Sequence, residues 1–184
     1  MAEGVLTKGV ALLDLVKLVR TQRASFDGVL DDETWAVVNS RILVGSWYPE
    51  ACLVRLLVAA DRVFGEGNLA LCRAFGRASA QQVLQTVYKT AVVPGDVLAS
   101  LRILAVSWSF IHNTGTVAVE TPSDGLVRVI VKDFGLPSPA ICVVFAGWIE
   151  GKVQVAGGKC QVVEEECRLR GQQACVYAVQ WTRE

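Results

Sequence analysis

The spacing of the apolar residues changes near residue 115, and this change limits the possible folds more than any other feature of the sequence. Upstream, apolar positions recur about every 3.6 residues, as in helices. Downstream, runs such as Thr116-Val117-Ala118-Val119-Glu120 alternate with a period of two, as in strands. Helices that precede and flank an antiparallel sheet give an α+β fold.

The pattern predicts about five N-terminal helices packed on a four-stranded antiparallel sheet. The sheet consists of two hairpins with one helix between them. The expected helices cover residues 6–23, 32–38, 49–64, 68–91, 97–111 and 140–155, and the expected strands cover 116–120, 126–132, 159–169 and 174–181. The length of 184 residues favours one domain over residues 1–184.

Charge and hydropathy exclude several classes of function. Lys and Arg together number 18, as do Asp and Glu, so no basic stripe points to nucleic acid. The most apolar window, 92–111, contains Asp96 and Arg102 and therefore predicts a core helix and no membrane span. The N-terminus lacks the features of a signal peptide, and we expect a cytoplasmic protein.

The six cysteines are better explained in a reducing cytosol by buried thiols and metal ligands than by disulfides. Cys52 and Cys72 lie in apolar helical contexts, which favour core positions. Cys167 and Cys175 flank a predicted tight turn, where residues on neighbouring strands lie only about 5 Å apart. Two thiolates at that distance can reach one metal ion.

Glu164 and Cys142 are candidates for two further ligands. Glu164 precedes Cys167 by three residues, so strict alternation places it on the opposite face unless a bulge intervenes. Cys142 begins the last predicted helix. Four such ligands would close a structural zinc site, but buried thiols without metal explain the spacing equally well, and Cys160 could be a bystander or a competing ligand.

The two segments 142–151 and 164–177 resemble the 4-vinyl-reductase-type small-molecule-binding domain, especially the form found in phenol-responsive transcription activators. They read C-V-V-F-A-G-W-I-E-G and E-E-E-C-R-L-R-G-Q-Q-A-C-V-Y. In that family a Cys-x4-Gly-aromatic-x-x-Gly segment, a Glu-x-x-Cys and a further Cys after a glycine turn hold zinc. The resemblance implies that Cys142, Glu164, Cys167 and Cys175 are the ligands.

Segments 46–50, 76–80 and 86–88 look like a family of unassigned function found largely in myxobacteria, and this similarity spans nearly the whole chain. The broader fold group includes subunits of the TRAPP vesicle-tethering complex and haem-based nitric-oxide sensor domains. Its members often dimerise through their helices, which implies a homodimer here.

His112 is the only histidine, which rules out a two-histidine metal site within one chain. A capping role at a helix C-terminus is the preferred interpretation, ahead of haem ligation. Trp108 lies one helical turn earlier, and Trp108, His112 and Trp148 are candidate pocket residues. His112 and Trp108 do not align with the histidine and tryptophan that recognise phenol in the aromatic-sensing relatives.

No phosphate-binding loop and no serine-nucleophile signature is present, so we expect no enzymatic activity. The favoured function is a sensor that binds a small apolar or aromatic ligand between the helices and the sheet, with a structural zinc and a separate effector protein. The alternative is a protein interaction scaffold of the TRAPP-subunit type without a ligand. A haem-binding sensor is a third possibility.

Overall fold

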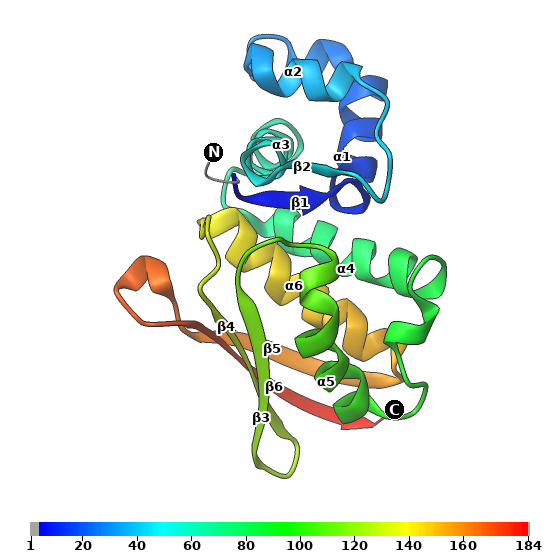
Figure 1. The fold of residues 1–184 in the computed structure, drawn as a ribbon, viewed down its shortest axis with the longest axis vertical. Helices are drawn as coiled ribbons and strands as arrows, with labels where there is room; N and C mark the ends of the chain where they lie inside the picture. Colours follow the sequence, from blue (N-terminus) through cyan, green and yellow to red (C-terminus); the bar gives the residue numbers. More distant parts are fainter. Residues whose placement is uncertain (1–3, 184) are drawn as a thin grey trace.

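The computed structural model describes residues 4–183 and contains helices followed by a sheet (Figure 1). The α-helices are α1 (Gly9–Thr21), α2 (Asp32–Asn39), α3 (Glu50–Phe64), α4 (Ala70–Gln85), α5 (Val97–Ser107) and α6 (Pro139–Val155). The strands are β1 (Leu6–Lys8), β2 (Trp47–Pro49), β3 (Thr116–Ser123), β4 (Leu126–Lys132), β5 (Gly158–Glu166) and β6 (Cys175–Arg183). The predicted α+β class, with five helices before the sheet, is confirmed.

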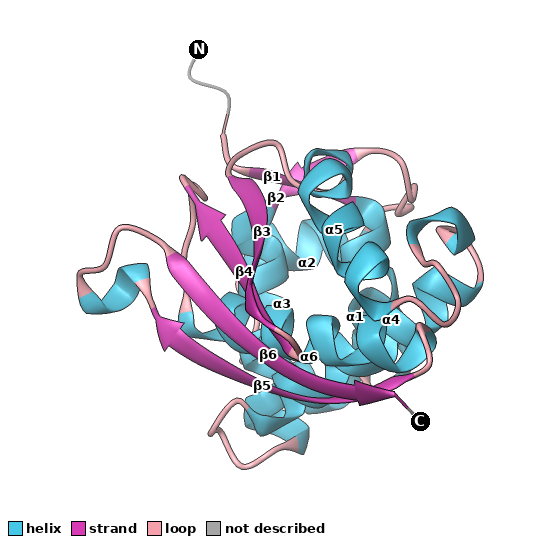
Figure 2. Cartoon of the chain, turned by 90° about the horizontal axis from the view of Figure 1, so that it is seen from below, coloured by secondary structure: helices cyan, strands magenta, loops and turns pink. Residues whose placement is uncertain are grey.

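The four long strands form one antiparallel sheet in the order β3-β4-β6-β5. The register pairs Val129 of β4 with Tyr177 of β6, and Tyr177 with Glu164 of β5. Helix α6 packs on β5 and α5 packs on β3, so the helices cover one face of the sheet (Figure 2). The order of the strands places the two predicted hairpins side by side.

The first strand corrects the prediction of a helix from residue 6, because residues 6–8 pair with 47–49 in a two-stranded sheet. Thr7 is fully buried there, and the backbone N–H of Lys8 donates to the carbonyl of Ile111 at 2.8 Å. These partners lie far away in the sequence, so local periodicity could not reveal the strand. The expected helix start near Pro49 is confirmed, with Glu50 as its first residue.

Several further boundaries differ from the prediction: α5 ends at Ser107 where a helix over 97–111 was expected, and β3 continues to Ser123. Helix α4 ends at Gln85 and a 3-10 helix (η2, Lys89–Ala91) follows, where one helix over 68–91 was expected. Strand β5 ends at Glu166, and residues 168–170 form a 3-10 turn (η4) before Gly171, whose φ of 85° lies in the left-handed region. After α4 and after β5 the chain changes direction, so neither element extends as far as predicted.

Helices α4 and α6 approach very closely because glycines lie where they cross. A Cβ atom on Gly147 would be 2.0 Å from the carbonyl oxygen of Arg73, and one on Gly76 would be 2.1 Å from that of Val144. Gly151 is equally confined, with the Arg77 carbonyl oxygen 2.4 Å from its Cβ position. Gly76 therefore belongs to the close crossing of the two helices.

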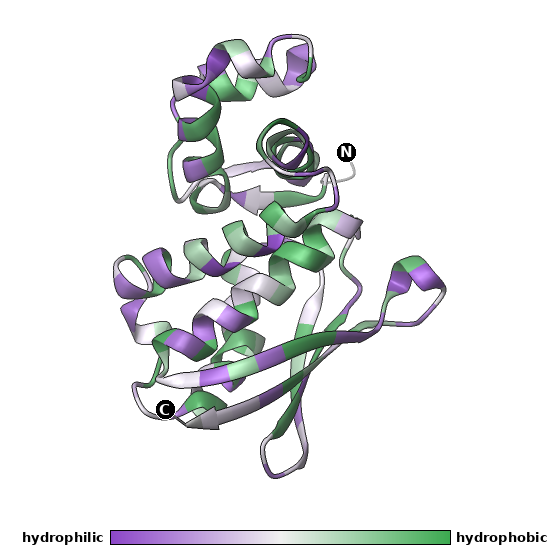
Figure 3. Ribbon diagram, turned by 180° about the vertical axis from the view of Figure 1, so that it is seen from behind, coloured by the Kyte–Doolittle hydropathy of each residue, from purple (hydrophilic) through white to green (hydrophobic). Residues whose placement is uncertain are grey.

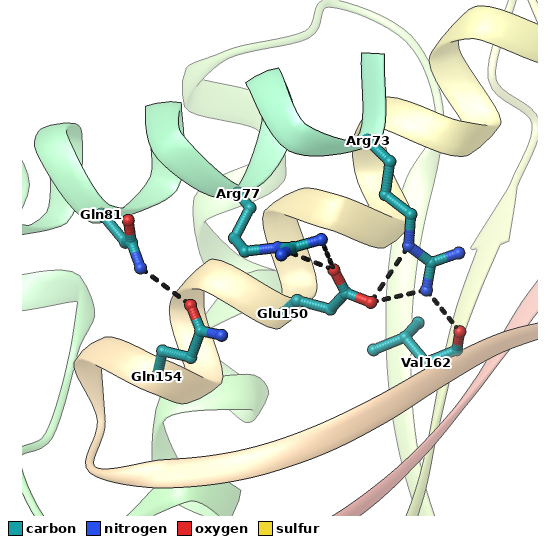
Figure 4. A network of polar contacts seen from close by, with 6 residues as sticks. All are labelled: Arg73, Arg77, Gln81, Glu150, Gln154 and Val162. Carbon is teal, nitrogen blue, oxygen red and sulfur yellow. Dashed lines mark hydrogen bonds and ion pairs between the residues drawn. The ribbon is translucent and has the colours of Figure 1, made fainter. Parts of the chain in front are cut away.

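A polar seam runs along one flank of this crossing (Figure 4). Arg73 and Arg77 of α4 both bind Glu150 of α6, with ion-pair distances of 2.6 and 3.0 Å. Arg73 also donates to the carbonyl of Val162 at 2.6 Å, which ties the seam to strand β5. Gln81 and Gln154 extend it by one hydrogen bond of 2.8 Å.

Apolar side chains from the helices and the sheet meet in one hydrophobic cluster, and Figure 3 shows hydrophobic colouring on the helices as well as on the strands. The hairpin turn that contains η4 projects away from the helices (Figures 1 and 3). No helix within residues 4–183 is both long and apolar enough to cross a membrane.

Candidate metal centre and apolar cavity

Four potential metal ligands from three segments converge where the start of α6 meets the β5–β6 hairpin. One ligand atom each from Cys142, Glu164, Cys167 and Cys175 lies within 4.8 Å of all the others. The Sγ atom of Cys167 is 3.8 Å from that of Cys142 and 3.9 Å from that of Cys175. Tetrahedral zinc with bonds of about 2.3 Å requires sulfurs about 3.8 Å apart, so the spacing suits zinc.

Glu164 reaches the cluster because strand β5 bulges next to it. Glu164 pairs with Tyr177 and Glu166 pairs with Val176, so Glu165 has no partner in the register. The extra residue shifts the alternation and turns Glu164 to the face of Cys167. The bulge that the sequence required for a fourth ligand is therefore present.

The cluster contains a buried carboxylate oxygen that lacks a partner. Oε1 of Glu164 has no hydrogen bond within the described chain, whereas Oε2 lies 3.3 Å from the guanidinium of Arg170. A buried polar atom without a partner is costly, and a bound cation would satisfy it. The donor set of three thiols and one carboxylate therefore fits zinc.

Burial sets the ionisation of the thiols in the cluster. Burial, followed by the nearby charge of Glu164, raises the pKa of the Cys142 thiol far above its ordinary value. Burial also raises the pKa of Cys175, while the backbone N–H of Arg168, 3.4 Å from its Sγ, opposes this rise. A divalent cation reverses this situation because it stabilises thiolates.

The remaining cysteines lie outside the cluster. Cys52 and Cys72 are buried in α3 and α4, as expected for core residues, and burial raises the pKa of each to about 11. Cys160 is a free, half-buried thiol on β5, and it does not belong to the four-ligand group.

A second feature is an apolar cavity of about 140 Å³ among the helices. This location corrects the expectation of a pocket between the helices and the sheet, since no strand residue lines it. Trp108, His112 and Trp148, the predicted pocket residues, all lie in its wall. The other lining residues are Val10, Ala11, Leu53, Phe75, Gly76, Ser79, Val83, Leu84, Tyr88, Ala91, Leu104, Ser107, Phe110, Ile111, Ile141, Val144 and Phe145.

His112 lies at the C-terminal end of a helical segment, as expected, and its side chain is held by a buried carboxylate that was not foreseen. Its Nδ1 lies 3.0 Å from Oε2 of Glu50, a residue that is 0% exposed. The imidazole stacks on Trp108 with 4.3 Å between ring centroids, and Trp108 Nε1 donates to the carbonyl of Thr114 at 2.8 Å. Glu50 is 62 residues away in the sequence, so the helix pattern around His112 gave no sign of it.

Aromatic rings connect the cavity with the thiol cluster. The ring of Phe145 lies edge-on to Trp108 at 5.3 Å and to Tyr177 at 5.2 Å. Trp108 and Phe145 line the cavity, and Tyr177 with Cys142 and Cys175 lines a smaller space of about 20 Å³ on the other side. The cavity and the thiol cluster are therefore joined by a continuous row of packed rings.

The sequence reading missed a buried lysine next to the cavity. Lys152 of α6 is 0% exposed, and its Nζ donates to the carbonyl of Ala91, a cavity residue, at 2.5 Å. The available signal was a single cation one helical turn after Trp148, on the face of the helix opposite Glu150.

Comparison with solved structures supports the fold group. An Fe(II) unliganded H-NOX protein from K. algicida is 12% identical, with a TM-score of 0.70 over 96% of this chain and 97% of that one. An H-NOX protein from S. oneidensis in the Fe(II)NO ligation state is 15% identical, with a TM-score of 0.66 over 96% and 99%. Subunit 3 of the trafficking protein particle complex from Naegleria fowleri, covalently bound to palmitic acid, is 13% identical, with a TM-score of 0.50 over 62% and 80%.

At these identities the likeness shows the fold alone. No protein-family model and no curated protein matches the sequence. The 4-vinyl-reductase and myxobacterial resemblances therefore stay predictions, while the resemblance to the wider group of haem-based sensors and TRAPP subunits is confirmed at the level of fold.

Proposed function

We propose that this chain is a non-enzymatic sensor module that binds a small apolar or aromatic molecule in the helical cavity and carries a structural zinc. The cavity is the observation that carries the proposal. An apolar cavity of about 150 Å³ in another protein stays dry and binds benzene, and the cavity here has nearly that volume, about 140 Å³. Its walls bring together aromatic side chains from α4, from the 3-10 helix that follows α5 (η3, Trp108–Phe110) and from α6.

The zinc would have a structural role because Cys142, Glu164, Cys167 and Cys175 together fill a tetrahedral coordination sphere. When bound, the ion supplies a fixed cross-link and leaves no open position for water. Cys142 belongs to α6, and the other three ligands belong to the β5–β6 hairpin. Their shared ligation would fasten the helix that lines the cavity to the sheet.

Haem, which the sensor branch of the fold group suggests, does not fit the residues present. Pockets for drug-sized ligands occupy about 300–1,000 Å³, and a porphyrin is at least that large, whereas this cavity measures about 140 Å³. We therefore assign the cavity to a smaller ligand.

An interaction scaffold without a ligand is the alternative from the TRAPP side of the fold group. A filled interior would favour it, and the cavity counts against it. We keep the homodimer and the separate effector as parts of the proposal, because a ligand inside a cavity acts on other molecules only through a change at the protein surface.

Ligand binding can be tested with benzene, toluene and phenol, followed by tryptophan fluorescence and by NMR. We expect saturable binding, since Trp108 and Trp148 line the cavity. The variant Ser79→Leu fills the cavity and should abolish binding. Ala78→Leu, on the exposed side of the same helix, serves as the control and should leave binding unchanged. Failure of all three compounds to bind would refute the proposal.

A further inference from the structure

Lys152 is a buried cation without a counter-charge. An ammonium carries three N–H donors, and the one hydrogen bond recorded for it goes to the carbonyl of Ala91. No ion pair is recorded for Lys152 within residues 4–183. Buried charges in proteins are ordinarily paired, so the site lacks a negatively charged partner.

Lys152 does not itself line the cavity, but its position on α6 places it next to residues that do. At about 100° per residue along a helix, Lys152 falls within the arc spanned by Ile141, Phe145 and Trp148, which all line the cavity. Its Nζ lies 5.4 Å from the ring centroid of Trp148, and its acceptor Ala91 is also a lining residue.

The polar seam of α6 lies on a different flank of the helix. Glu150 and Gln154 point to the arginines and the glutamine of α4 (Figure 4). The glycines at 147 and 151, which press against α4, separate this flank from the cavity flank. Lys152 is therefore the one charged residue on the cavity side of α6.

We propose that the ligand of the cavity is a small aromatic monocarboxylate, whose ring lies among the aromatic side chains and whose carboxylate pairs with Lys152. This inference rests on the proposed ligand-binding function and specifies its ligand class. A carboxylate supplies both the counter-charge and acceptors for the two remaining N–H groups. Charge-assisted hydrogen bonds of this kind are about twice as strong as neutral ones.

The ionisation of Lys152 is consistent with this assignment. Burial lowers its pKa to about 8, so most of the amine still carries a proton at neutral pH. Burial is the only cause of this shift. A ligand with a negative charge would offset the energetic penalty of burying the Lys152 ammonium. No side chain of the described chain does so.

The test compares benzoate with benzamide, its neutral analogue of nearly the same shape, and with benzene. We expect wild-type protein to bind benzoate at least about tenfold more tightly than benzamide, the factor that one charge-assisted contact readily supplies. Lys152→Met should remove this preference and keep benzene binding. Lys89→Met, at a nearby exposed lysine on η2, should retain the preference.

A second measurement needs no variant. The Lys152 amine can be titrated by NMR in wild-type protein, and benzoate should raise its pKa whereas benzamide should not. If benzene binds but benzoate has no advantage, or if Lys152→Met keeps the advantage, the carboxylate assignment is wrong and the proposed function stands. If no aromatic compound binds, both are overturned.

Discussion

Cys175 is the first residue of strand β6, and its Sγ lies 3.9 Å from that of Cys167. Its replacement removes one of the four proposed zinc ligands. We expect Cys175→Ser to lose most of the bound zinc and about 3 kcal/mol or more of stability, a loss of the size that removing a metal can cause. Cys160→Ser, at a half-buried thiol outside the cluster, is the control and should change neither. Metal analysis and denaturant unfolding measure both. Full zinc occupancy in Cys175→Ser would contradict the ligand assignment.

Lys152 affects stability as well as ligand choice. Its pKa is lowered from 10.5 to about 8, so the folded state binds fewer protons than the unfolded state between these values. Wild-type stability should therefore rise with pH from about 8 to about 10.5, by up to about 3 kcal/mol.

Lys152→Met should be more stable than wild type at pH 7 in the absence of ligand, and the difference should shrink above pH 8. Urea unfolding from pH 6 to 10.5 checks this, because the pH slope that belongs to Lys152 disappears in the variant. Parallel pH profiles of the two proteins would contradict the buried, unpaired ammonium.

At the scale of elements, the contact between α4 and α6 depends on glycine. Alanine is ordinarily the better helix former, yet a Cβ on Gly147 would lie 2.0 Å from the Arg73 carbonyl. We expect Gly147→Ala to cost about 1–3 kcal/mol, as overpacked cores do, and to alter the cavity beside the crossing. Gly45→Ala is the control, since nothing lies within 4 Å of its Cβ position. Thermal unfolding that ranks Gly147→Ala at or above wild type would contradict this packing.

The elements predicted correctly from the sequence are those that the spacing of neighbouring apolar residues indicates. The change of period near residue 115 located the sheet, and the need for a bulge beside Glu164 followed from simple alternation. Strand β1 was missed because Thr7 is buried by residues 40 or more positions away. The Glu50–His112 pair and the helical site of the cavity also depend on long-range packing, which periodicity does not encode.

At the scale of the whole molecule, a zinc ion bound by Cys142 would hold the start of α6 against the β5–β6 hairpin. We expect removal of the metal by a chelator to lower the free energy of unfolding by the same amount as Cys175→Ser. A loss of about 3 kcal/mol lowers the melting temperature by roughly 6–12 °C for a chain of this size. Because metal binding requires deprotonated thiols, zinc should also be released as the pH falls. Calorimetry checks both, with Cys175→Ser as the control that chelator leaves unchanged.

The candidate metal centre and the cavity are linked by Trp108, Phe145 and Tyr177. The most direct test is a crystal structure of protein purified without chelator and soaked in bromobenzene, with anomalous data collected at the zinc and bromine edges. The account predicts a zinc peak among the three sulfurs and Oε1 of Glu164, and a bromine peak among Phe75, Trp108 and Trp148. A cavity free of bromine at saturating bromobenzene, in an otherwise unchanged fold, would contradict it.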